Sequence, residues 1–61
     1  MKHAYRVDQH DLTSGRVKTY AVIASTPRGA SMKVSRDHYL YLSINKVYFN
    51  NKLVYSTKWA R

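Results

Sequence analysis

The side chains of this chain that could carry acid–base chemistry are three histidines and three aspartates (His3, His10, His38, Asp8, Asp11 and Asp37). The segment Asp8–Asp11 reads Asp-Gln-His-Asp, so a carboxylate and an imidazole lie close together, as general acid–base catalysis requires. A solvated turn after a strand has the same composition. His38 follows Arg36-Asp37, where a histidine suits the C-terminal end of a helix dipole. We therefore expect no catalytic residue and no enzymatic activity.

Other reactive motifs are missing from the sequence. Cysteine is absent, which excludes thiol catalysis, disulfides and zinc knuckles. There is no phosphate-binding loop and no glycine-rich dinucleotide motif, and Ser14-Gly15 lacks the context of a nucleophile elbow. The His and Asp spacings match no known metal site. We expect neither a metal nor a cofactor.

The charge of the chain is its strongest chemical feature. Lys and Arg number 11 and Asp and Glu number 3, so the formal net charge is 11 − 3 = +8. A charge of this sign predicts a partner that carries negative charge: nucleic acid, a nucleoprotein, an acidic protein surface or an anionic membrane. No apolar run approaches the roughly 20 residues of a membrane span. Among these partners we expect nucleic acid or a nucleoprotein, and no membrane.

Basic and aromatic residues alternate in three segments: 16–20, 46–49 and 55–59. Nucleic-acid bases stack on aromatic rings while Lys and Arg follow the phosphates, so this pattern is compatible with nucleic-acid binding. Tyrosine and phenylalanine are also common strand residues that fill a core. No motif of a sequence-specific nucleic-acid-binding family is present.

The elements that would position these residues are four strands and a helix. Alternation of apolar and polar residues predicts strands at 2–9, 16–24, 40–49 and 53–59. Thr26 or Ser25 before Pro27 predicts a helix start, and the helix is expected to run to about Asp37. Ala30 and Val34, spaced i and i+4, would then face the sheet.

The strand faces follow from the same alternation. In the first strand one face carries His3, Tyr5, Val7 and Gln9, and in the second we expect Tyr20, Val22 and Ala24 to face the core. The third strand changes phase between Leu40, Leu42, Ile44 and Val47, Phe49, which predicts a bulge near Asn45-Lys46. Residues 50–52 predict a hairpin turn, and in the fourth strand one face would carry Leu53, Tyr55, Thr57 and Trp59.

The 61 residues form one domain, residues 1–61, because the chain is too short for two lobes. The predicted fold class is α+β: a four-stranded, mainly antiparallel sheet with one helix packed on one face, in the order β-β-α-β-β. The absence of cysteine, and of an apolar stretch after Met1, favours the cytoplasm. We expect a monomer.

A resemblance rests on two sets of residues in this order of elements. The first is Met1-Lys2, Ala4-Tyr5, the strand ending at Ala24, Ala30 and Ser35-Arg36-Asp37. The second is Ser43-Ile44, Lys46-Val47, Asn51, Leu53 and Lys58. Together they resemble small phage-encoded anti-CRISPR proteins that act on the type I-F surveillance complex. The chain departs from that pattern at Ser31 and Met32, where the family has basic residues, and at His38, where it has an amide.

The resemblance implies a non-catalytic phage-type inhibitor in the host cytoplasm. It would bind the backbone subunits that carry the guide RNA and block the pairing of target DNA. Arg28, Lys33 and Arg36 are expected on the exposed side of the helix, and Arg36, Lys46 and Lys58 match basic positions of the family. The predicted partner-binding residues are Arg28, Lys33, Arg36, His38, Lys46 and Lys58.

Two alternatives remain at this point. One is a stand-alone basic protein of phage or mobile-element origin that binds DNA or RNA directly. The other is a small ribonuclease toxin, which would require a catalytic histidine that the sequence does not single out.

Overall fold

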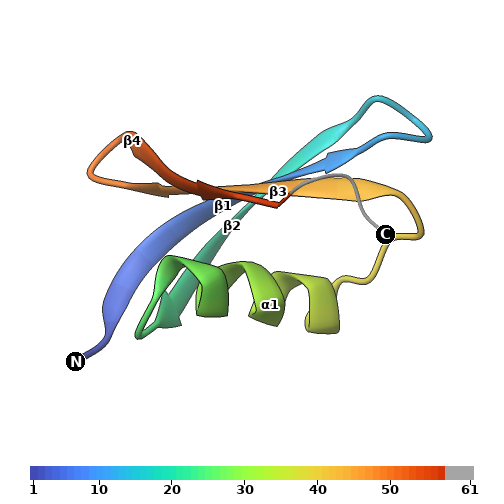
Figure 1. Ribbon diagram of the computed structural model, residues 1–61. Helices are drawn as coiled ribbons and strands as arrows, with labels where there is room; N and C mark the ends of the chain where they lie inside the picture. The colour runs from blue at the N-terminus through green and yellow to red at the C-terminus, as the bar shows by residue number, and fades with distance from the viewer. Residues whose placement is uncertain (58–61) are drawn as a thin grey trace.

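The computed structural model describes residues 1–57, which form β1 (His3–Asp11), β2 (Val17–Ala24), α1 (Pro27–Asp37), β3 (Ser43–Phe49) and β4 (Lys52–Ser56). The strands make one antiparallel sheet in the order β2-β1-β3-β4. Helix α1 lies across one face of it (Figure 1), here called the inner face; the other is the outer face. The predicted α+β class and the order β-β-α-β-β are confirmed.

The helix begins where the sequence predicts. Thr26 has an extended backbone with φ of −137°, and its hydroxyl accepts a hydrogen bond of 2.9 Å from the Gly29 amide. Pro27 occupies the first helical position. A backbone N–H there would have no acceptor within the helix, so the lack of an N–H in proline costs no hydrogen bond. The helix ends with the His38 amide donating to the Val34 carbonyl at 2.8 Å. No helix within residues 1–57 is long and apolar enough to cross a membrane.

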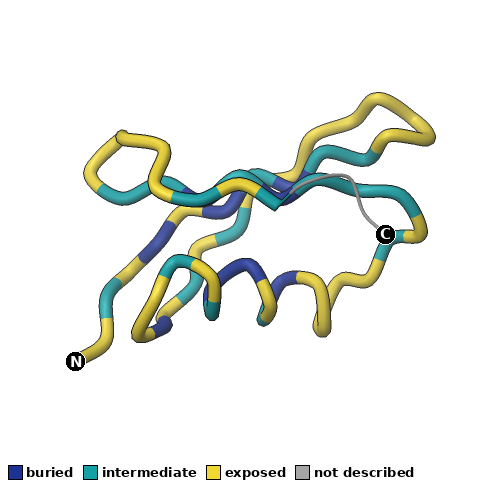
Figure 2. The backbone as a smooth tube through the Cα atoms, in the orientation of Figure 1, coloured by how far each residue is buried: buried dark blue, intermediate teal, exposed yellow. Residues whose placement is uncertain are grey.

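The core lies between α1 and the inner face (Figure 2). Its buried apolar residues are Tyr5, Val7, Ala24, Ala30, Val34 and Val47, with Tyr20, Val22, Phe49 and Tyr55 packed at the margin. The inward faces predicted for the second strand and for the helix are therefore confirmed, and in β1 the face that carries Tyr5 and Val7 is the inward one. Three polar side chains are buried with them: Gln9, Ser31 and Asn45. Asn45 links sheet to helix, because its amide nitrogen donates to Ser31 and to the Ser35 hydroxyl.

The predicted third strand is wrong in its start and in its bulge. Strand β3 begins at Ser43, and residues 40–42 belong to the connection from the helix. Its pairing with β1 runs without interruption from Ser43 to Tyr48. Asn45 and Val47 are both buried and both point inward, so the inward face of β3 alternates regularly. The apparent change of face in the sequence has two causes: Leu40 and Leu42 belong to the connection and not to the strand, and the inward residue Asn45 is polar.

The irregularity lies in β4 instead. Val47 pairs with Tyr55 and Tyr48 with Leu53, so Val54 is an extra residue in β4. Leu53 and Tyr55 therefore lie on opposite faces, and the prediction that they share one is wrong. The hairpin turn is confirmed: Asn50 and Asn51 have φ of 52° and 64°, the left-handed region that asparagine tolerates. Strand β4 ends at Ser56, while Lys58 and Trp59 lie outside the described residues.

Candidate functional site

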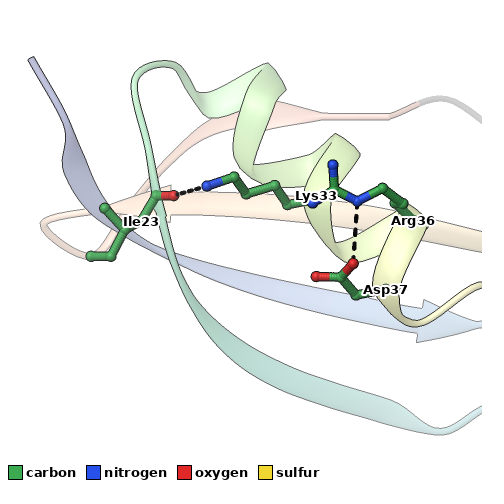
Figure 3. A network of polar contacts seen from close by, with 4 residues as sticks. All are labelled: Ile23, Lys33, Arg36 and Asp37. Carbon is green, nitrogen blue, oxygen red and sulfur yellow. Dashed lines mark hydrogen bonds and ion pairs between the residues drawn. The ribbon is translucent and has the colours of Figure 1, made fainter.

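The three helix cations do not form one continuous stripe. With Ala30, Ser31 and Val34 facing the sheet, a helical rotation of about 100° per residue places Arg28 and Lys33 on opposite flanks of α1. Lys33 is half-buried, and its Nζ donates to the Ile23 carbonyl at 2.6 Å (Figure 3). Arg36 points away from the sheet. Lys33 is therefore tied to β2 rather than lying on the fully exposed side.

Arg36 forms a local ion pair. Its Nε lies 3.2 Å from Asp37 Oδ1, with both side chains more than half exposed (Figure 3). An ion pair between exposed side chains contributes little to stability. The guanidinium thus stays available to a partner at the C-terminal end of α1.

Lys46 lies on the other side of the molecule. It is on the outer face of β3, opposite Asp8 of β1 and Ser56 of β4. The sheet separates it from the helix cations, so the predicted partner-binding residues do not converge on one surface. Lys58 lies outside the described residues.

His38 is held in a defined position at the end of α1. Its ring stacks on Tyr20, with ring centroids 4.2 Å apart and an interplanar angle of 17°. Its backbone carbonyl accepts a hydrogen bond of 2.8 Å from Gln9 Nε2. Gln9 is 1% exposed, so this part-buried bond ties the end of the helix to the interior side of β1.

A hollow of about 430 Å³ opens beside this stack, where the inner face extends past the end of α1. We call it the basic–aromatic pocket; it is lined by Gln9, Asp11, Ser14, Arg16, Lys18, Tyr20, His38, Tyr39 and Leu40. Arg16, Lys18 and Tyr20 reach it together because alternate residues of a strand share a face. Their alternation in the sequence was a visible signal, yet Arg16, Lys18, Tyr20 and Tyr39 were not among the predicted site residues. Tyr39 could not be predicted from periodicity, because it lies in the connection after the helix.

Among the described residues, the one carboxylate that lines this pocket is already engaged in the β1–β2 turn. Asp11 Oδ1 accepts hydrogen bonds from the Thr13 amide at 2.9 Å and the Ser14 amide at 3.4 Å. The Thr13 amide is the main cause that lowers the pKa of Asp11. Asp11 is therefore ionised at neutral pH, and its charge stabilises the turn. Arg16 and Lys18 remain as cations facing the pocket.

In the rest of the described chain, too, the carboxylates are engaged and most cations have no acidic partner. Residues 1–57 hold nine basic side chains and three aspartates, a balance of 9 − 3 = +6. Asp8 interacts with Arg6 at 3.6 Å and with the Thr19 hydroxyl at 3.0 Å, and Asp37 pairs with Arg36. Within residues 1–57, therefore, 9 − 2 = 7 cations take part in no ion pair.

The three histidines have separate surroundings. His3 packs against Tyr5 and Phe49, His10 is on the outer face between Val17 and Ile44, and His38 is at the helix end. Asp8, the neighbour of His10 on the outer face, is engaged by Arg6 and Thr19. The described residues contain no cluster of three or more His, Cys, Asp or Glu side chains that could hold a metal ion.

Comparisons with protein-family models, with curated proteins and with solved structures found no match to this chain.

Proposed function

We propose that this protein is a non-catalytic binding protein whose partner contains nucleic acid, and that it inhibits a host nucleoprotein complex by occupying it. The observation that supports this most is the surplus of cations: seven basic side chains of residues 1–57 take part in no ion pair there. Like charges on a small domain oppose its folding, so a polyanion that neutralises them is the fitting partner.

Within that class, the resemblance to anti-CRISPR proteins implies the type I-F surveillance complex as the target. Binding to its guide-RNA-carrying subunits would block pairing of target DNA. The family makes its contact along the helix and at the helix's C-terminal end. Arg36 is exposed there, and His38 lines the adjoining basic–aromatic pocket. This surface would therefore be the contact.

The basic–aromatic pocket also favours a second candidate function, direct binding of DNA or RNA by the protein alone. Arg16 and Lys18 provide cations for phosphates, while Tyr39 (74% exposed) and the exposed His38 provide rings on which a base can stack. This candidate shares the polyanionic ligand with the first and differs only in needing no protein component.

A matched pair of lysines tests the role of the pocket. Lys18 lines it, whereas the exposed Lys52 lies at the β3–β4 turn, at the opposite end of the sheet (Figure 1). Lys18→Ala should weaken binding of a fluorescent single-stranded oligonucleotide roughly fivefold and lower the salt slope by about one. Lys52→Ala removes the same charge and should change both values less. Equal losses would show a general effect of net charge and remove the pocket from the proposal.

Charge reversal at Arg36 tests the end of the helix. Arg36→Glu should weaken binding to the purified surveillance complex by roughly tenfold, because a cation is lost and an anion gained at the contact. The melting temperature should hardly change, since the Arg36–Asp37 pair is exposed. A pull-down with this protein after nuclease treatment would separate the two candidate functions. Retention of the surveillance complex on the protein supports the inhibitor, and its loss supports direct nucleic-acid binding.

Stoichiometry distinguishes an inhibitor from a catalyst. Block of target-DNA capture should saturate at a fixed ratio of this protein to the complex. Replacing His3, His10 and His38 together with Asn or Gln should leave most of the inhibition intact. Turnover at substoichiometric amounts that these replacements abolish would refute the binding proposal and support the ribonuclease alternative.

A further inference from the structure

Within residues 1–57, strand β2 forms one edge of the sheet and pairs only with β1. It is eight residues long, and its pairing with β1 is continuous from His10–Val17 to His3–Ala24. The opposite edge, β4, has five residues and is interrupted at Val54. Edge strands that are long and regular are the natural template for pairing with another chain, whereas short or bulged strands are not. Of the two edges, β2 therefore has the geometry for adding a strand.

Two hydrogen bonds show which backbone groups face this edge. The Asp11 amide donates to the Arg16 carbonyl at 2.8 Å, so the backbone N–H and C=O groups of Arg16 point toward β1. In an antiparallel pair, successive residues direct these groups alternately toward and away from the partner strand. The backbone groups that point away from β1 are therefore those of Val17, Thr19, Ala21 and Ile23. The bond from Lys33 Nζ to the Ile23 carbonyl agrees with this assignment (Figure 3).

A second hollow lies beside this edge, between β2 and α1. Its volume is about 270 Å³, and it is called the edge hollow here. Tyr20 and Val22 contribute apolar surface to it, while Lys33, Asp37 and His38 make much of the rest of its lining polar. A strand added to β2 would direct every second side chain into this space, as in other complexes where a peptide extends a sheet.

We propose that the free edge of β2 binds an extended acidic segment of a partner protein as an added strand. The edge presents alternating N–H and C=O groups, which another peptide backbone matches, whereas a phosphate chain offers acceptors alone. The charge at the edge favours an acidic segment, because Lys33 and Lys18 lie along it and the nearby Asp37 is paired with Arg36. A second copy of this chain would bring its own net charge of +8 to the edge, and repulsion between like charges disfavours that pairing.

The geometry also sets the side-chain pattern of the segment. Carboxylates at alternate positions would approach Lys18 and Lys33, and an apolar side chain between them would enter the edge hollow near Tyr20 and Val22. The side chains at the intervening positions of the segment would lie on the outer face of the sheet. This surface requires no nucleic acid, so it goes beyond the proposed function and can be tested without a nucleoprotein.

The test uses a short capped peptide in which threonine alternates with glutamate and valine. In amide hydrogen exchange of the unmodified protein, the peptide should slow exchange at Thr19 and Ala21, whose amides face the edge. Exchange at Tyr20, whose amide already bonds to β1, should not change. The same peptide with lysine in place of glutamate should give no protection.

Two variants of one residue isolate the backbone contribution. Ala21→Pro removes an outward amide, a change that edge strands tolerate, and should weaken peptide binding about tenfold. Ala21→Val keeps the amide and should bind within about twofold of the parent. The exchange result on the unmodified protein decides the question if Ala21→Pro does not fold.

Four outcomes would overturn the proposal. They are no gain in protection at saturating peptide, equal binding of the lysine peptide, protection at Thr19 and Ala21 without peptide together with the mass of a dimer, and protection of the same amides by a single-stranded oligonucleotide. The dimer result would assign the edge to a second copy of the chain, and the oligonucleotide result would assign it to nucleic acid.

Discussion

Substitution of Val34 by aspartate should unfold the domain. Val34 is 2% exposed and belongs to the apolar cluster between α1 and the inner face. At about 0.05–0.15 kcal/mol per residue, a chain of 61 residues has a free energy of unfolding of roughly 3–9 kcal/mol. Burying an unpaired carboxylate costs several kcal/mol. The cost is comparable to the whole stability, so most Val34→Asp molecules should be unfolded at neutral pH.

A smaller change at the same site calibrates this estimate. Val34→Ala removes two methyl groups at about 0.8 kcal/mol each and leaves a small cavity, so the loss should be about 2–3 kcal/mol. Urea denaturation followed by circular dichroism measures it. Val54→Asp makes the aspartate change at a residue that is 44% exposed and should be far milder.

The pH dependence gives an independent check on Val34→Asp. Burial raises the pKa of a carboxyl group in the folded state, so the folded protein binds more protons than the unfolded chain. The stability of the variant should therefore rise as the pH falls from the raised folded pKa toward the ordinary aspartate value. A melting curve that coincides with the parent's, or that does not depend on pH in this direction, would show that α1 does not pack through Val34.

Two further predictions concern polar groups. Asn45→Ala removes the buried amide that donates to Ser31 and Ser35 and should lower the free energy of unfolding by about 2–3 kcal/mol. Ser56→Ala, at an exposed residue of β4, is its control, and equal losses in urea denaturation would contradict the role of the amide. The lowered pKa of Asp11 means that the ionised form stabilises the fold, and this contribution is lost as the pH falls below the ordinary value of 3.8. Asp11→Asn cannot titrate, so below that pH it should lose less stability than the parent; parallel pH profiles would refute the assignment.

Local sequence patterns were sufficient for most of the elements. Thr26-Pro27 marked the helix start because a hydroxyl cap and a proline satisfy the first helical amides without any distant partner. Asn50-Asn51 marked a hairpin because both residues tolerate the left-handed conformation. The alternation in β1 placed Tyr5 and Val7 on one face, and the packing of α1 against that face made it the core.

Elements whose pattern depends on distant partners were predicted less well. Asn45 is polar, so hydropathy alone does not show that it is buried; only the serines of α1 above it make that burial favourable. The extra residue at Val54 is defined by its pairing with β3, and a single strand carries no mark of it. Leu40 and Leu42 were assigned to the strand because an apolar residue in a connection cannot be distinguished from one in a strand by its type alone.

Residue types and their local spacing were enough to establish the element types, their order, the positive charge and the residues that alternate within each strand. Contacts between the elements settle which of these residues come together. The packing of α1 on the inner face separates Lys46, on the outer face, from the helix cations and brings His38 beside Arg16, Lys18 and Tyr20. The strand order β2-β1-β3-β4 leaves β2 at an edge. The physical reason is that local conformation depends on neighbours in the chain, whereas pockets and edges depend on contacts between segments far apart in it.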